Sequence, residues 1–302
     1  MKNIVIIFIL SSGINLKAQN FISYYKTINN AEIANLNKNY AKSDSIYQIA
    51  FKMIERPFKE DFYLAAINSE KLKDNTKTYD YLFKAIQKGL TIERIKTDIS
   101  FFKNSKEWKK LSSEYDELRK NYLKNLNISI QNEIKEMIAK DQKTRNPIFG
   151  SVNKMKKTDN YNFNRILELI QQNGNKWLGF SLIGEETPKG KYNVEDNISL
   201  MLLHFEKKQI EQLKPYLFQA VLNGEIYPYQ YARIIDYTIG KEISLNRDSN
   251  NKIDPEICFL YGTYLNTKIC DCNKAEFERE KIGFEPLSDF YRKINSNFQC
   301  KK

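Results

Sequence analysis

The chain has 302 residues, of which 41% are hydrophobic and 13% aromatic, enough to build the cores of about two ordinary domains. Its 48 lysines and arginines outnumber its 37 aspartates and glutamates, which gives a formal net charge of +11. The excess is scattered lysine, whereas arginine is the residue favoured for bidentate contacts to phosphate, so nucleic acid is not an expected partner.

Residues 1–19 have the layout of a secretory signal peptide. Lys2 supplies a positive start, residues 4–10 form an unbroken apolar run, and Ala18 offers a small residue for cleavage. The apolar run is much shorter than the roughly 20 residues that span a bilayer, so a membrane anchor is the less favoured alternative. We therefore expect an exported protein, periplasmic or secreted, without integral membrane association.

Residues 20–125 contain a repeat. Ala50 and Ala85 lie 35 residues apart in two similar stretches, close to the period of about 34 residues that is typical of helix–turn–helix repeats. Small residues let paired helices approach, and aromatic residues such as Tyr47 fill the space between them. This half resembles a tetratricopeptide array, without the usual tryptophan and glycine of the first helix. Helices around Ile95 and Trp108 are expected to cap the stack.

Residues 126–302 are expected to form a separate, mostly helical domain. Pro215 is expected to kink or restart its helix, Gly240 to stop the next one, and residues 177–184 to be extended. Residues 258–272 are the best strand candidates. The predicted class is therefore mainly α, a tetratricopeptide-like helical array followed by a mostly helical domain with a small β-hairpin near the C-terminus. Apolar spacings of three and four, with a polar, lysine-rich loop after the first segment, predict helices at 130–144, 163–173, 194–208, 209–223, 228–239, 274–282 and 286–294.

All four cysteines follow residue 257: Cys258, Cys270, Cys272 and Cys300. In an exported protein an even number favours two disulfides. Cys270 and Cys272 are separated by one residue, and their side chains point apart in an extended chain. Cys258 is therefore expected to pair with one of them and Cys300 with the other. A four-thiolate zinc site is the alternative, but such sites favour two-residue gaps within each pair, so no metal is expected.

Several short motifs of the second half occur in one order. They are AKDQKTR (139–145), NRILELIQQNG (164–174), SLIGEE (181–186), His204, YARIID (231–236), LYGT (260–263) and EFEREKIGFEPL (276–287). In this order they resemble one uncharacterised bacterial domain family with an Asp-Gln-x-x-Arg helix end, a helical His, a Tyr-Gly-Thr turn and an Arg-x-x-x-Gly segment. Leu203, Tyr237 and Tyr264 depart from its polar pattern. The resemblance implies a shared polar set: Asp141, Gln142, Arg145, Asn164, His204, Asp236, Tyr261, Gly262, Thr263 and Arg279.

His204 is the only histidine and the main candidate for catalysis. An imidazole titrates near neutrality and can act as a general base, and on its predicted helix it lies at the edge of the apolar face. The candidate site combines His204 with Asp141, Gln142, Arg145 and Tyr261, with Asp141 orienting the imidazole. The alternatives are a half-buried structural histidine and an ordinary i, i+4 ion pair between Asp141 and Arg145.

Two functions are compatible with these patterns. The first is a module that binds a protein or peptide partner, because helical repeats form concave surfaces that hold peptides. The second is a small hydrolase or transferase around His204, and the three departures from the family pattern would have impaired it. These departures favour binding. No glycine-rich phosphate loop or Gly-x-Ser-x-Gly turn occurs, so no cofactor is expected, and Glu185 is expected to carry solvated charge.

Overall fold

The computed structural model describes most of the chain and is almost wholly helical. It leaves the predicted signal peptide, residues 1–19, and Cys258 outside the described residues. Within the described part, the only strands are two segments of two residues each. The prediction of a mainly α fold is therefore confirmed. The described residues are 21–146, 151–185, 190, 192, 197–245, 259–264 and 268–300.

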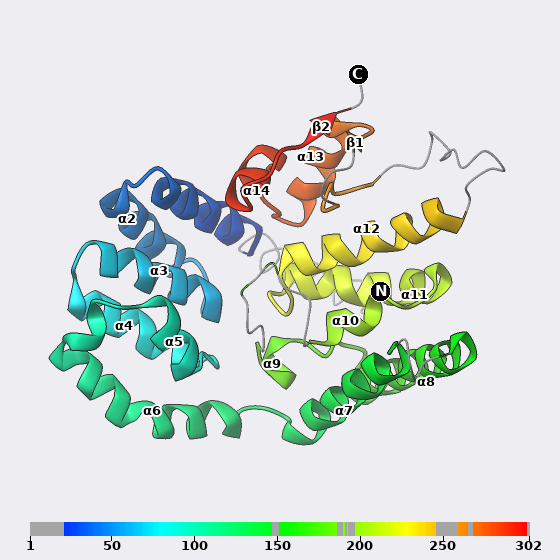
Figure 1. The fold of residues 1–302 in the computed structure, drawn as a ribbon, viewed down its shortest axis with the longest axis horizontal. Helices are drawn as coiled ribbons and strands as arrows, with labels where there is room; N and C mark the ends of the chain where they lie inside the picture. Colours follow the sequence, from blue (N-terminus) through cyan, green and yellow to red (C-terminus); the bar gives the residue numbers. More distant parts are fainter. Residues whose placement is uncertain are drawn as a thin grey trace, which may run out of the picture.

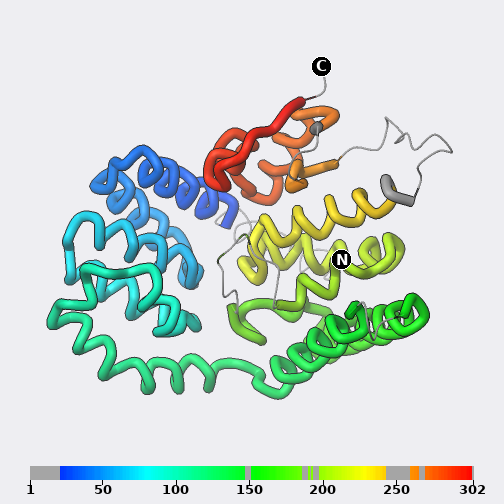
Figure 2. Tube along the Cα trace, viewed as in Figure 1, coloured from blue at the N-terminus to red at the C-terminus, as the bar shows by residue number. Residues whose placement is uncertain are grey.

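The helices follow one another around a broad ring, from α2 at the upper left of Figure 1 through α6 at the bottom to α14 at the top. The tube in Figure 2 shows that the first helix, residues 21–36, lies beside the C-terminal segment. The remaining elements are α2 (Tyr40–Ala50), α3 (Lys59–Lys71), α4 (Asn75–Ile86), α5 (Ile92–Asp98), η1 (Phe102–Asn104), α6 (Lys106–Lys124), α7 (Ile128–Thr144), α8 (Val152–Gln172), α9 (Phe180–Ile183), α10 (Ile198–Leu202), α11 (Lys207–Leu222), α12 (Pro228–Leu245), β1 (Lys268–Ile269), α13 (Cys272–Lys281), α14 (Leu287–Lys293) and β2 (Gln299–Cys300).

The 35-residue spacing corresponds to two helix–turn–helix pairs with the same turn. Lys38 and Lys73 both have positive φ, 59° and 57°, directly after the first helix of each pair. The next residues, Asn39 and Asp74, each cap the second helix by accepting a backbone N–H three residues further on. The pairs thus share a left-handed turn and a side-chain cap, which fixes the angle between their helices.

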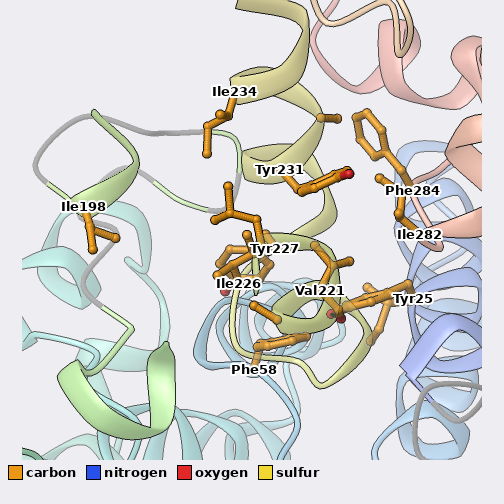
Figure 3. Close-up of a cluster of buried hydrophobic side chains, with 14 of the residues drawn as sticks. Tyr25, Phe58, Ile198, Val221, Ile226, Tyr227, Tyr231, Ile234, Ile282 and Phe284 are labelled. Carbon is orange, nitrogen blue, oxygen red and sulfur yellow. Dashed lines mark hydrogen bonds between the residues drawn. The ribbon is translucent and has the colours of Figure 1, made fainter. Parts of the chain in front are cut away.

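The two halves of the chain meet in one hydrophobic core, which runs from the first helix to α14. The ring of Tyr25 stacks parallel to that of Phe58, with 5.7 Å between centroids, and Phe58 lies 4.9 Å from the ring of Tyr227 (Figure 3). The Tyr25 hydroxyl also donates a hydrogen bond to the carbonyl oxygen of Val221, at 3.1 Å. These contacts fix the second half against the first helix and α3.

Residues 177–184 are not extended as predicted, because part of this segment forms the short helix α9. The backbone N–H of Phe180 donates to the carbonyl oxygen of Glu225, and that of Ser181 donates to the Glu225 carboxylate. A side chain at Gly179 would meet the Cβ of Glu225 at 2.4 Å, so this close approach requires glycine. The turn between α11 and α12 thus anchors α9, which a local pattern does not reveal.

The predicted helix 194–208 is wrong at its C-terminal end, because α10 ends at Leu202 and residues 203–205 form a turn. Glu206 begins α11 with a capping box, in which Gln209 accepts the backbone N–H of Glu206. This capping box starts a new helix, although the apolar residues continue at helical spacing. His204 therefore lies in a tight turn between two helices and not on a helix face.

Pro215 does not restart its helix and Gly240 does not end its helix, contrary to the predictions. Helix α11 continues through Pro215, with Leu213 and Leu217 fully buried on either side of it. Helix α12 continues through Gly240, where a Cβ would meet the Tyr264 hydroxyl at 3.1 Å. Packing of buried side chains outweighs the lost hydrogen bond at the proline. The glycine provides room for an aromatic ring against the helix.

The strand pair near the C-terminus differs from the expected hairpin. β1 and β2 are parallel, with Ile269 opposite Cys300, and a disulfide joins Cys272 to Cys300. Cys270 is disulfide-bonded as well. The disulfide holds β2 beside β1. The strand β1 therefore pairs with a segment far away in the sequence instead of forming a hairpin with the next one.

Candidate functional site

Four of the five candidate catalytic residues lie together. The last turn of α7 carries Asp141 and Gln142, Arg145 is the C-cap of this helix, and the turn between α10 and α11 carries His204. The distance between His204 Nε2 and Asp141 Oδ2 is 3.6 Å. The structure therefore brings these four residues into one cluster.

The Asp141 carboxylate is fully buried and is held by its own helix. Its Oδ1 accepts from Arg145 at 2.8 Å, and its Oδ2 accepts from Gln142 Nε2 at 2.8 Å and from Arg145 Nε at 3.2 Å. Arg145 forms a second ion pair with Asp159 of α8. This is a buried network and not a surface ion pair. Because Arg145 and Gln142 occupy the carboxylate, Asp141 does not orient His204 by a close hydrogen bond.

Two charged residues of this cluster, Asp159 and Lys241, were not predicted. Lys241 of α12 donates from Nζ to the carbonyl oxygen of Phe205, beside His204. Burial lowers the pKa of Lys241 to about 8, with Asp159 opposing this shift and Arg145 adding to it. Burial also raises the pKa of Asp159, against the effect of Arg145. The network thus connects α7, α8, the His204 turn and α12.

His204 is neutral at physiological pH. Its side chain is 20% exposed, and its Nε2 has no hydrogen-bond partner among the residues that the structure describes. Burial lowers the pKa of His204 to about 4, Arg145 and Lys241 add to this shift, and Asp141 opposes it. A base with so low a pKa is weakly matched to proton abstraction near neutrality. The arrangement therefore fits a structural role for His204 in its turn better than a role in acid–base catalysis.

Replacing His204 with alanine is expected to cost about 1 kcal/mol of unfolding free energy or less, because the Asp141 network does not depend on it. The pKa shift adds a second expectation. Since the folded-state pKa lies below the unfolded value of 6.5, wild-type stability falls as the pH drops from 6.5 to about 4. His204→Ala removes this part of the pH dependence.

Urea unfolding of both proteins at pH 7 and pH 5 provides the measurement. A loss of about 2 kcal/mol or more at pH 7 would identify His204 as a structural hydrogen-bonding residue. An unchanged difference between the two proteins at the two pH values would contradict the lowered pKa. Lys140→Ala, an exposed position on α7, serves as the control.

The remaining residues of the polar set, except Asn164, form a second cluster. The buried Asp236 accepts hydrogen bonds from the backbone N–H groups of Leu260, Tyr261 and Thr263 and from the Thr263 hydroxyl, at 2.7–2.9 Å. The buried Arg279 donates to the carbonyl oxygen of Tyr261. In the described part of the chain, no hydrogen bond or ion pair joins this cluster to His204. Tyr261 belongs to this turn and not to the histidine cluster, and Asn164 lies on the exposed side of α8.

A groove lies between the first helix, α2 and α14, and its space of ≈ 710 Å³ includes open solvent. Its polar lining includes the exposed carboxamides of Asn30, Asn37 and Asn39. Asn37 Oδ1 accepts from Arg292, and Asn39 Oδ1 caps α2, which leaves the NH₂ groups of both side chains available. The Asn30 side chain forms no hydrogen bond with the residues that the structure describes. The remaining lining residues are Ile33, Ala34, Lys42, Ile46 and Asp289.

Comparison of the chain with protein-family models, with curated proteins and with solved structures finds no match. Among the residues described, no helix is long and apolar enough to cross a membrane. The same residues contain no group of three or more His, Cys, Asp or Glu side chains placed to hold a metal ion.

Proposed function

We propose that this protein binds peptides in the groove between the first helix, α2 and α14. The observation that carries the proposal is the combination of outward-facing carboxamides with an apolar floor in one groove. The NH₂ groups of Asn37 and Asn39 can donate to the carbonyl groups of a peptide, and the Asn30 side chain offers both a donor and an acceptor, as a peptide bond does. Such a surface is complementary to a chain whose backbone is not already hydrogen-bonded.

The groove is suited to an extended peptide. An extended segment exposes its backbone N–H and C=O groups, whereas a helix has satisfied them internally. The half-buried side chains of Ile33 and Ile46 offer an apolar surface for one or two peptide side chains. Lys42 and Asp289 place opposite charges in the lining, which fits a peptide that carries both an acidic and a basic residue.

Selection from a random dodecapeptide library displayed on phage tests the proposal. The test variant is Asn30→Asp/Asn39→Asp, because aspartate still caps α2 but has no NH₂ donor. The control is Asn121→Asp, at an exposed position of α6 outside the groove. Wild type and control should enrich the same peptides, and the double variant should bind them about tenfold more weakly or worse. Equal binding by all three proteins contradicts the proposal.

The alternative, a hydrolase or transferase around His204, is favoured by one observation. A half-buried lysine whose pKa burial lowers to about 8 lies close to this histidine. Against it, Asp141 is committed to Arg145 and Gln142. If peptide binding is the function, His204→Ala should enrich the same peptides as wild type.

A further inference from the structure

The hairpin formed by α7 and α8 carries a concentrated positive charge at the end where α7 stops and α8 starts. The two helices lie at the lower right of Figure 1, on the outer edge of the ring. In the described residues between 139 and 161, every exposed charged side chain is a lysine. These lysines, which we call the basic tip, are Lys140, Lys143, Lys154, Lys156 and Lys157. Two helices thus bring together lysines that are spaced along the sequence.

The acidic side chains of this region do not neutralise the basic tip, because they are engaged inside the hairpin. Asp141 and Asp159 both pair with Arg145. Asp141 is fully buried, and the Asp159 side chain is 16% exposed. The exposed carboxylates of the two helices, Glu136 and Glu168, lie further from the connection between α7 and α8. This end of the hairpin therefore presents positive charge to solvent without exposed negative charge.

Two large apolar side chains are exposed at the same end of the hairpin. Val152 is 64% exposed and Tyr161 is 54% exposed. The ammonium group of Lys140 on α7 lies 5.1 Å from the ring centroid of Tyr161 on α8, so the ring lies beside a lysine of the basic tip. Tyr161 also follows Lys157 by one helical turn, which places these two side chains on one side of α8. Cationic and apolar groups therefore share one surface.

We infer that the basic tip binds the surface of a bilayer that contains anionic phospholipids, with Val152 and Tyr161 entering the interface between headgroups and acyl chains. An anionic bilayer attracts lysines through its surface potential, which requires no fixed geometry between each ammonium group and a phosphate. Tyrosine is enriched at membrane interfaces, because its ring is apolar and its hydroxyl is polar. A soluble polyanion would contact the lysines but would leave both apolar side chains in water. This surface is independent of the peptide groove, which lies between the first helix, α2 and α14.

Co-sedimentation of the protein with lipid vesicles tests the inference. Vesicles of phosphatidylcholine with about one third phosphatidylglycerol should bind the protein, and vesicles of phosphatidylcholine alone should not. Raising the salt concentration to about 0.5 M should weaken the binding, because screening shortens the range of the attraction to about 4 Å. Equal sedimentation with both kinds of vesicle, or with neither, would overturn the inference.

Lys156→Glu/Lys157→Glu identifies the part of the protein that binds. Each lysine near an anionic surface contributes about fivefold in affinity, so this variant should bind anionic vesicles at least about 20-fold more weakly. Glutamate near the start of α8 is favoured by the helix dipole, so the variant should fold. The matched control is Lys52→Glu/Lys109→Glu, at two exposed positions in the first half, because it changes the net charge equally. Equal losses in the two variants would show that only the overall charge matters, and the inference would fail.

Val152→Ser/Tyr161→Ser distinguishes a bilayer from a soluble polyanion. This variant should bind anionic vesicles about fivefold more weakly or worse, because both apolar side chains leave water at the interface. If it binds them as tightly as wild type, the basic tip is a site for polyanions in general, and the inference is wrong. The wild-type comparison of the two kinds of vesicle does not depend on the folding of any variant. None of these outcomes bears on the peptide groove, which the asparagine variants test separately.

Discussion

Arg279→Ala is expected to destabilise the protein by about 4 kcal/mol, because it removes a buried charged group and leaves the hydrogen-bond partners of that group unpaired. The guanidinium is fully buried on α13. Its Nε donates to the carbonyl oxygen of Glu285 at 2.6 Å, and another nitrogen donates to that of Tyr261. Its plane lies 3.7 Å from the ring centroid of Phe284. Alanine leaves the carbonyl groups of Tyr261 and Glu285 without this donor and opens a cavity beside an aromatic ring.

Urea unfolding followed by circular dichroism measures this effect. Arg279→Lys provides a milder variant, because one ammonium group replaces a planar fork, and should cost about 2 kcal/mol. Lys281→Ala is the matched control on the same helix. Lys281 pairs with Glu278 at the surface, so its loss should stay within about 0.5 kcal/mol. A loss below about 1 kcal/mol for Arg279→Ala would show that this arginine does not hold the turn at residues 260–263.

The long helices were predictable because their signal is local. Periodic apolar residues in α7, such as Ile134 and Met137, are buried as their spacing indicates. The errors arise where a distant residue decides the local structure. Glu225 anchors α9, and Gly240 allows Tyr264 to lie against α12. The parallel pairing of β1 likewise depends on β2, which the Cys272–Cys300 disulfide links to the start of α13.

The same errors explain what was missed in the histidine cluster. Lys241 lies beyond the predicted end of its helix at residue 239, whereas α12 extends to Leu245. The sequence pattern predicts a polar loop before the helix at 163–173, whereas Asp159 belongs to α8. The order of the motifs gives a single set of polar residues. It could not separate the His204 cluster from the Asp236 cluster, because their separation depends on the packing of α7, α8, α12 and α13.

Glu185 was expected to carry solvated charge, and this prediction is wrong. It is 5% exposed, and its carboxylate accepts from the backbone N–H groups of Lys59 and Glu60 at the start of α3, at 2.8 and 3.3 Å. The Tyr227 hydroxyl donates to it as well. One carboxyl group therefore connects α3, the end of the α9 segment and the turn before α12. No local pattern indicates this, because its three partners lie far away in the sequence.

Wild-type stability is expected to fall by on the order of 3 kcal/mol between about pH 5 and pH 8 because of Glu185. Burial raises the pKa of Glu185 from 4.5 to about 8; Lys59 opposes this shift, and Asp61 and Glu60 add to it. The folded protein thus keeps a proton that the unfolded chain releases. The resulting stabilisation is complete below about pH 4.5 and is lost as the pH rises through about 8.

Glu185→Gln isolates this contribution, because glutamine has a similar shape and cannot ionise. The unfolding free energy of wild type minus that of the variant should decrease as the pH rises through this range, as measured by urea unfolding at half-unit steps. Taking the difference removes the opposite slope that His204 contributes below pH 6.5. Glu211→Gln, at an exposed position of α11, should give a constant difference. If Glu185→Gln also gives a constant difference, Glu185 is ionised in the folded protein, and Lys59 with the N–H groups of α3 outweighs its burial.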